Sequence, residues 1–255
     1  MGLSGKLLGA GLGYFLGGPL GAVIGGIIGH YVKDASLPAG QGPGASDPRV
    51  RQQQQELYFV ASLVGILTAM IQADGDVRKE EVATIRRFFS ERLGYRGESL
   101  EIVRDLIKQF LRQRVDLDSL CADVVQRAEY ATRLLLVECL LDVAMADGHL
   151  HPQERLVFDR CVGLLGISAA DADGIRARSA TGPSAGTRRC SDCEVLGVAA
   201  DGDEATVKKA YRELVKKYHP DRVSHLGEEF RDLAHQKFLE IQNAYDRLCK
   251  SRGWT

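Results

Sequence analysis

The chain has 255 residues, enough for more than one domain, because domains cluster at about 100 to 150 residues. Its 33 basic and 34 acidic residues leave a formal net charge of -1, so no overall positive field draws it toward nucleic acid. Six cysteines are too thinly spread for a small disulfide-stapled fold. Composition therefore argues against a basic nucleic-acid binder and a small disulfide scaffold, and any electrostatic function must be local.

An uncharged stretch lies close to the N-terminus, between Lys6 and Lys33. As a helix, residues 7–29 alone would be about 35 Å long, which is sufficient to cross the hydrocarbon core of a bilayer. The stretch is also longer than the apolar region of a cleaved signal peptide. We therefore predict that residues 1–33 form a single transmembrane helix, kinked at Pro19 because proline removes one backbone donor.

The same segment carries a glycine at every fourth position. Such small residues line one helical face and let two membrane helices approach closely, which predicts self-association as a homodimer. The alternative is that glycine is simply common in membrane helices and that the register is partly chance. The glycines of this face are Gly5, Gly9, Gly13, Gly17, Gly21, Gly25 and Gly29.

Residues 34–55 are rich in Gly, Pro, Ala and Gln and have almost no bulky apolar side chain, which predicts a flexible linker. In residues 56–177 the apolar residues return at helical spacing, and no stretch alternates as a strand does. We therefore expect an all-α domain of six or seven helices in this region.

Two segments of this helical domain share a pattern in which an apolar helix ends in Ala-Asp-Gly and a glutamate follows near the start of the next helix. One interpretation is helix capping, because Asp accepts backbone donors and Glu favours a helix N-terminus. The other is a divalent-cation site, because carboxylate oxygens are the ligands that calcium or magnesium takes. The four candidate ligands are Asp74, Glu81, Asp147 and Glu154.

The repeated pattern resembles the TerB-like tellurite-resistance family over roughly residues 56–175. The resemblance implies a helical fold, and it implies a metal site at the four carboxylates. No cofactor other than this candidate divalent metal is expected.

Residues 178–190 again have few bulky apolar side chains and are predicted to be a second linker. The remaining residues, 191–255, are predicted to form a compact helical unit. A short helix ends at Gly197, a second opens at Asp203 and runs to Tyr218, and a last amphipathic helix covers roughly residues 228–249. The last two helices should form an antiparallel hairpin.

Four short motifs follow one another in this unit: Leu196-Gly197-Val198, Lys209-Ala210-Tyr211-Arg212, Tyr218-His219-Pro220-Asp221-Arg222 and Phe238 with Ile241, Ala244 and Tyr245. Together they resemble a J domain. The resemblance implies that the unit docks on a DnaK-type chaperone and stimulates ATP hydrolysis there. The residues it implies in docking are His219, Pro220, Asp221, Lys208, Tyr211, Arg212 and Lys217.

Physical chemistry agrees with this implication. A turn fixed by Pro220 presents the imidazole of His219 and the carboxylate of Asp221 beside a cationic helix. Such a surface suits charge-steered docking into an acidic groove of a protein partner. The hydrolytic residues then belong to the partner, and this chain is not an enzyme.

The order of a transmembrane span, a TerB-like domain and a C-terminal J domain is similar to that of the DjlA-type co-chaperones. This similarity implies a single-pass protein of the bacterial inner membrane whose C-terminal domains lie in the cytoplasm. The alternative function is a metal-responsive membrane sensor, in which the TerB-like domain binds a divalent cation.

Overall fold

The computed structural model describes residues 21, 48–73, 75, 77–112, 116–146, 151–180 and 191–254. Within these ranges the chain contains helices, turns and loops but no strand, which confirms the all-α prediction. No helix of this described part is both long enough and apolar enough to span a membrane. The predicted transmembrane helix at residues 1–33 lies outside the described residues, apart from Gly21.

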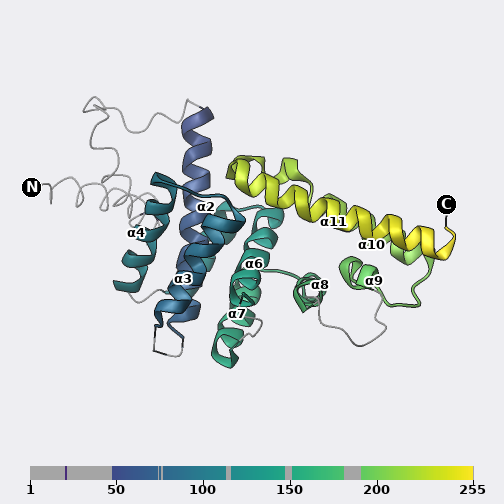
Figure 1. The fold of residues 1–255 in the computed structure, drawn as a ribbon, viewed down its shortest axis with the longest axis horizontal. Helices are drawn as coiled ribbons and strands as arrows, with labels where there is room; N and C mark the ends of the chain where they lie inside the picture. The colour runs from purple at the N-terminus through teal and green to yellow at the C-terminus, as the bar shows by residue number, and fades with distance from the viewer. Residues whose placement is uncertain are drawn as a thin grey trace, which may run out of the picture.

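The helices form two packed units, a broad middle domain and an elongated C-terminal unit (Figure 1). In the middle domain seven α-helices and one π-helical turn are described. They are α2 (Pro48–Ile71), α3 (Lys79–Arg87), η2 (Phe88–Arg92), α4 (Glu98–Arg112), α5 (Leu117–Arg127), α6 (Tyr130–Ala144), α7 (Pro152–Leu164) and α8 (Ala169–Ala180).

Helix α6 lies at the centre of the middle domain. Its sequence is apolar around the whole circumference, so it is buried on every side instead of along one stripe. Helices α2, α7 and α8 all pack against it. The C-terminal half of α2, from Phe59 to Ile71, is also almost fully buried. The core of the middle domain therefore forms around these two helices.

The flexible linker predicted over residues 34–55 is wrong at its C-terminal end, because α2 already begins at Pro48. Pro48 occupies the first helical position, where a missing backbone donor costs nothing. The glutamines and arginines that follow it are good helix formers. A low content of apolar residues therefore does not indicate the absence of a helix here. The second predicted linker, 178–190, likewise begins with the last residues of α8.

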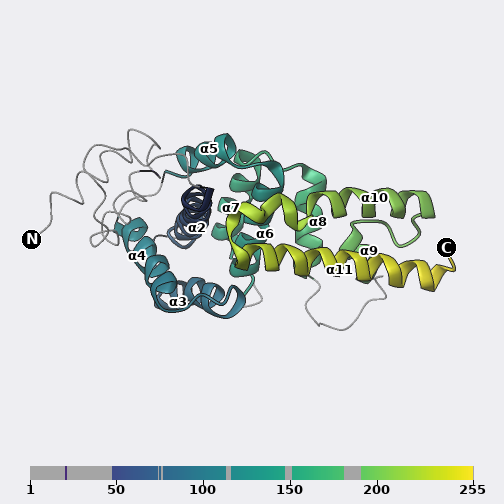
Figure 2. The ribbon, with the colours of Figure 1, turned by 90° about the horizontal axis from the view of Figure 1, so that it is seen from above.

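The C-terminal unit contains α9 (Ser191–Leu196), α10 (Glu204–Lys217), the 3-10 helix η3 (Pro220–Leu226) and α11 (Glu228–Arg252). Figure 2 shows α10 and α11 lying side by side, with the chain running in opposite directions. Asp203 caps α10 by accepting a hydrogen bond from the Thr206 backbone N–H at 2.9 Å. Tyr211 and Tyr245 stack between the two helices with their ring centroids 4.1 Å apart. The predicted helical hairpin is confirmed.

The two units pack on each other around η3. This 3-10 helix contacts α2 and α6, and α9 contacts α8. Phe230, at the start of α11, is fully buried, and its ring lies edge-on to that of Phe59 with centroids 4.7 Å apart. Tyr95, which follows η2 in the middle domain, packs on the same Phe230 ring, with the two ring centroids 6.4 Å apart. The hydrophobic core is therefore continuous between the two units.

Gly65 in α2 lies where two core side chains approach the helix backbone. A Cβ at this position would lie 2.9 Å from Leu120 Cδ2 and 3.0 Å from Phe110 Cζ. We predict that Gly65→Leu lowers the free energy of unfolding by about 1 to 3 kcal/mol, because a larger side chain overpacks this site. Urea unfolding of the detergent-solubilised chain measures the change.

Gly163→Ala is the matched control. Gly163 lies in α7, and no atom lies within 4 Å of a Cβ added there. This replacement should raise the free energy of unfolding by up to about 1 kcal/mol, because alanine loses less backbone entropy in a helix than glycine does. A Gly65→Leu protein as stable as the wild type would contradict the close packing at α2.

Candidate functional site

A turn with an ordered backbone follows α10. Tyr218 ends the helix, and His219 then caps η3, with its Nδ1 accepting a hydrogen bond from the Asp221 backbone N–H at 3.3 Å. Pro220 occupies the first position of η3, where its fixed φ suits the start of a helix. The Ser224 hydroxyl donates to the Asp221 carbonyl oxygen at 2.9 Å. The turn is thus held by its own hydrogen bonds, and its two titratable groups project from it.

Both of these groups are accessible to a partner. The His219 side chain is 47% exposed and the Asp221 side chain 89% exposed, and His219 Nδ1 lies 3.6 Å from Asp221 Oδ2. On its other side the imidazole ring packs edge-on against Phe238 of α11, with centroids 6.0 Å apart. Contact with Phe238 and with the turn backbone therefore fixes the direction in which the imidazole points.

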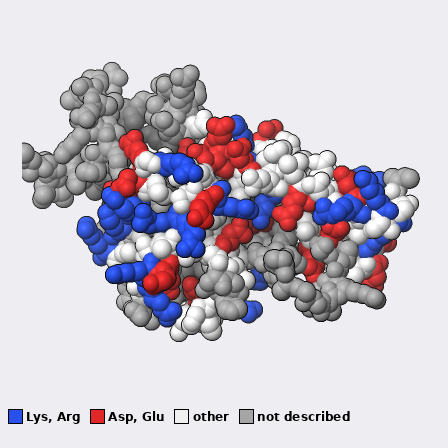
Figure 3. Space-filling model, in the orientation of Figure 1, with Lys and Arg blue, Asp and Glu red and all other residues white. Residues whose placement is uncertain are grey.

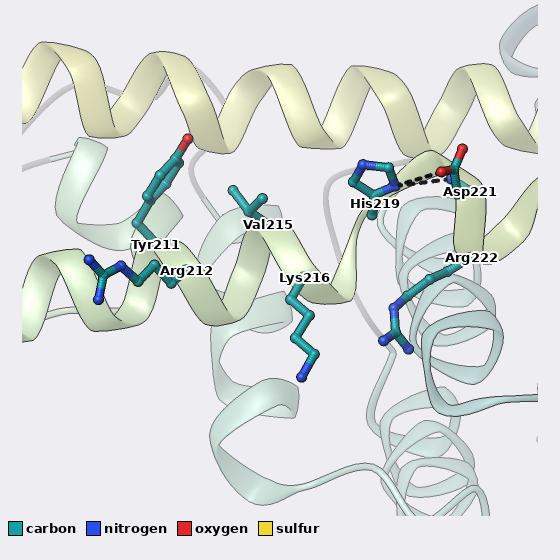
Figure 4. Close-up of a pocket in the computed structure, with 7 residues that line it drawn as sticks. All are labelled: Tyr211, Arg212, Val215, Lys216, His219, Asp221 and Arg222. Carbon is teal, nitrogen blue, oxygen red and sulfur yellow. Dashed lines mark hydrogen bonds and ion pairs between the residues drawn. The ribbon is translucent and has the colours of Figure 1, made fainter.

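An open groove of about 420 Å³ runs from this turn along α10. In Figure 4 the side chains of Lys216 and Arg222 extend away from α11, and Arg212 lies further along α10 beside Tyr211. These three cationic side chains line the groove that ends at the accessible His219 and Asp221. The groove-lining residues are Tyr211, Arg212, Val215, Lys216, His219, Asp221 and Arg222.

The groove contains four of the seven predicted docking residues: Tyr211, Arg212, His219 and Asp221. Pro220 shapes the turn between them, and Lys208 lies on α10 one helical turn before Arg212. Lys217 differs from the rest, because its ammonium is 2.6 Å from Asp171 Oδ1 of the middle domain.

Lys216 and Arg222 line the groove but were not among the residues predicted to dock. Helical spacing could have predicted the position of Lys216. Lys208, Arg212 and Lys216 follow one another at intervals of four residues and therefore share one face of α10. Lys217 lies about 100° further round the helix, toward the middle domain.

The charges of this protein act locally, as the composition predicted. Figure 3 shows acidic and basic side chains interspersed over the face in view, without a broad field of either sign. The cationic row of the groove is therefore a local feature of α10 and the turn.

The opposite side of the turn is covered by the middle domain. Val223 and Leu226 are buried there, and the Gln52 side chain of α2 donates to the Ser224 carbonyl oxygen at 3.4 Å. His225 Nε2 lies 3.4 Å from the Thr132 hydroxyl oxygen of α6. One side of the turn is thus accessible and the other is packed against protein.

The carboxylates considered as metal ligands are only partly described. Glu81 accepts a hydrogen bond from the Arg78 backbone N–H at 2.9 Å, and Glu154 accepts one from the His151 backbone N–H at 3.0 Å. Each glutamate thus takes the reciprocal position of a helix-capping box. Asp74 and Asp147 lie outside the described residues, and the described ones contain no cluster of three or more ligand side chains suited to a metal. The metal site stays a prediction, while capping accounts for both glutamates.

The glycine face of the predicted membrane helix also lies outside the described residues, apart from Gly21. Its role in self-association stays a prediction.

Three family models match the chain in order. Residues 1–41 match the co-chaperone DjlA transmembrane domain, residues 61–177 match the tellurite resistance protein TerB, and residues 193–253 match the DnaJ domain. These matches confirm the three resemblances seen in the sequence. The groove lies entirely within the DnaJ-domain match.

Individual relatives of the chain carry the same family name. A co-chaperone protein DjlA of Vibrio vulnificus is 30% identical over 84% of this chain and 83% of its own length. The DjlA of Vibrio cholerae is 29% identical over 99% of both chains, and that of Escherichia coli O157:H7 is 34% identical over 47% of this chain and 52% of its own. No solved structure matches the chain.

The contact between His225 and α6 predicts a pH dependence. Burial lowers the pKa of His225 from its ordinary value of 6.5, and the nearby Glu129 carboxylate opposes this shift. The folded protein therefore binds fewer protons at this site than the unfolded chain does. Its contribution to stability is fully present above about pH 6.5 and is lost as the pH falls through the lowered folded pKa.

We predict that His225→Gln reduces the loss of stability between about pH 7.5 and pH 5.5, because glutamine carries no charge at either pH. Urea unfolding midpoints at the two pH values measure the effect. His235→Gln is the matched control, because His235 is an exposed residue of α11. Equal pH slopes in the wild type and the His225→Gln protein would contradict the prediction.

Proposed function

Because the chain belongs to the DjlA family of membrane-anchored co-chaperones, we propose that it stimulates the ATPase of a DnaK-type chaperone through its J-domain turn. The observation that carries the proposal is the turn itself: His219 and Asp221 are accessible at the end of a cationic groove. The family is one of co-chaperones and not of catalytic enzymes. In this proposal the chain supplies a docking surface, and the partner hydrolyses ATP.

The groove suits an acidic protein surface. Arg212, Lys216 and Arg222 would attract such a surface and raise the rate of encounter. The turn would then bring the His219 imidazole and the Asp221 carboxylate into contact with the partner in one fixed arrangement. Because the turn is held by its own hydrogen bonds and by packing of Val223 and Leu226, docking would cost little conformational entropy.

We propose further that the protein is a single-pass component of the bacterial inner membrane with its middle and C-terminal domains in the cytoplasm. A DnaK-type partner and its ATP would then be on the same side of the membrane as the groove. The match to a DjlA transmembrane domain at residues 1–41 supports a membrane anchor at this end of the chain.

His219→Gln is predicted to reduce stimulation of the partner's ATPase by at least about tenfold, because a buried interface anchor typically costs more than 2 kcal/mol of binding energy when truncated. Steady-state ATP hydrolysis by a DnaK-type chaperone, with and without the full-length protein, measures this. The matched control is His151→Gln, an exposed position at the start of α7 in the middle domain.

Stimulation by the wild-type and His151→Gln proteins together with its loss in the His219→Gln protein would establish the docking role. Equal stimulation by all three would contradict it. A wild-type protein that leaves the ATPase rate unchanged would refute the co-chaperone mechanism proposed here.

Self-association is a second part of the proposal. The seven glycines between Gly5 and Gly29 would form a groove on one face of the membrane helix, in which a second copy packs closely. Two copies would present two J domains to one partner or client, which raises the effective local concentration of the groove.

The triple replacement of Gly13, Gly17 and Gly21 by leucine is predicted to abolish the homodimer, because leucine prevents close backbone approach in the membrane. Crosslinking of the full-length protein in membranes measures the dimer fraction. Replacement of Leu8, Leu12 and Leu16 by isoleucine is the control, since these lie between the glycines and keep the segment apolar. An undiminished dimer fraction in the leucine variant would exclude the glycine face as the contact.

A further inference from the structure

We infer that the middle domain positions the J-domain turn, with the buried carboxylate of Glu138 as the principal positioning group. The J domain is then not a mobile module on a tether but is fixed to the TerB-like domain in a single orientation, with its groove facing outward. The effect on the partner's ATPase rests on the proposed function, whereas the structural part does not.

Glu138 is the one charged residue among the fully buried side chains of the described part of the chain. It lies on α6 and is 3% exposed. Its Oε1 accepts a hydrogen bond from the Tyr218 hydroxyl at 2.7 Å, and its Oε2 lies 3.7 Å from Lys237 Nζ. A carboxylate buried away from water requires hydrogen-bond donors or an opposite charge, because an unpaired buried ion would be strongly disfavoured. Both of these groups come from the C-terminal unit, so the charge is compensated across the domain boundary.

The position of Tyr218 relates this contact to function. Tyr218 is 4% exposed and directly precedes His219, the first residue of the turn. Its hydroxyl is held by Glu138, and its backbone N–H ends α10 by bonding to the Leu214 carbonyl oxygen at 2.9 Å. Any shift of the turn relative to α6 would therefore break a charge-assisted hydrogen bond in a site that water does not reach.

Lys237 also acts electrostatically on a second carboxylate of α6, that of Asp142. Burial raises the pKa of Asp142, one helical turn after Glu138, and the positive charge of Lys237 is the main influence that opposes this. Only 14% of the Lys237 side chain is exposed. Lys237 belongs to α11, so its ion pair with Glu138 holds the other helix of the hairpin.

Asp171 provides a further contact at the end of α10. It is 10% exposed, and its carboxylate accepts hydrogen bonds from Lys217 Nζ at 2.6 Å and from the Ser168 and Tyr130 hydroxyls. Lys217 and Tyr218 are consecutive, so two adjacent residues before the turn are held by two different helices of the middle domain, α8 and α6. This arrangement restrains rotation of α10 about its own axis.

Helix α2 touches the same turn from a third direction, through Gln52 and through the Glu56 carboxylate beside Gly227. Gly227 has a φ of +96°, a backbone conformation that glycine adopts far more readily than other residues. A Cβ at this position would lie 2.7 Å from Glu56 Cδ. Because α2 is the first described helix after the predicted membrane segment, the contacts fix the groove relative to the helix that leads to the anchor.

The test uses the full-length protein in detergent micelles and measures amide hydrogen exchange in residues 219–226. Tyr218→Phe removes only the hydroxyl, and Glu138→Leu removes the carboxylate at similar volume. Each should speed exchange in this segment by about tenfold or more, since a hydrogen bond to a charged group is lost at the turn. Glu138→Gln keeps an acceptor oxygen for Tyr218 and should restore most of the protection.

Tyr58→Phe is the matched control, because its ring lies under the Arg127 guanidinium within the middle domain. It should leave the exchange of residues 219–226 unchanged. Unchanged exchange in both the Tyr218→Phe and Glu138→Leu proteins would overturn the inference. So would loss of protection throughout α6, because Glu138 would then be a folding residue and not a positioning one.

The second measurement is the stimulated ATPase as a function of co-chaperone concentration. A loosened turn must be ordered before it docks, so the half-saturating concentration should rise in a variant whose turn is open for a substantial fraction of the time. The expected factor is one plus the ratio of open to ordered turn, with maximal stimulation unchanged. Complete loss of protection in residues 219–226 with an unchanged half-saturating concentration would overturn the positioning role. Absence of stimulation by the wild type refutes the proposed function instead, and the exchange measurement then still decides whether the turn is held by Glu138.

Discussion

Helix α6 is apolar on all sides, and a helix of this kind is stable in water only when other elements cover its whole circumference. Helices α2, α7 and α8 of the middle domain cover part of it, and η3 of the J domain covers another part. The one fully buried charge in the described residues, Glu138, lies on this helix and is compensated by Tyr218 and Lys237 of the J domain. Burial of α6 therefore requires contacts from both the middle domain and the J domain, and these contacts hold the two domains together.

The two sides of the J-domain turn consequently have different tasks. The side with Val223 and Leu226 is buried against α2 and α6, where apolar contact and a few specific hydrogen bonds hold it. The other side carries His219 and Asp221 at the end of the cationic groove and is accessible. Packing on the first side orders the residues that the second side presents. A partner would then meet a preformed surface, which lowers the entropic cost of docking.

The capping glutamates illustrate a different relation between sequence and structure. Glu81 and Glu154 occupy equivalent places in two related helix starts, and each satisfies a backbone N–H that the helix itself leaves unpaired. Such a repeat follows from the need to begin two helices. Helix capping therefore explains the positions of both glutamates without a bound ligand.

Local features were largely predictable from the sequence. The helical hairpin around α10 and α11 follows from 3.6-residue periodicity, the Asp203 cap and the His219-Pro220 break, all of which are short-range signals. The start of α2 was missed because glutamine and arginine are helix formers that add no apolar periodicity.

Contacts between distant segments were not predictable. The pairing of Lys217 with Asp171, 46 residues away, depends on how α8 and α10 come together. Helical spacing places Lys216 and Lys217 on different faces of α10. Only the direction of the middle domain decides that Lys217 pairs with it while Lys216 lines the groove. The burial of Glu138 also required the fold, because a glutamate within an apolar helix gives no indication of which segment supplies its donors.

The most direct test of the account is hydrogen exchange in the full-length wild-type protein before and after addition of a DnaK-type chaperone with ATP. The account predicts new protection in residues 208–222, where the groove and turn lie, with unchanged protection in α6 and in residues 223–233 on the packed side. Loss of protection in α6 and residues 223–233 on binding would show that the J domain must leave the middle domain to act. That result, or no new protection in residues 208–222, would contradict the account.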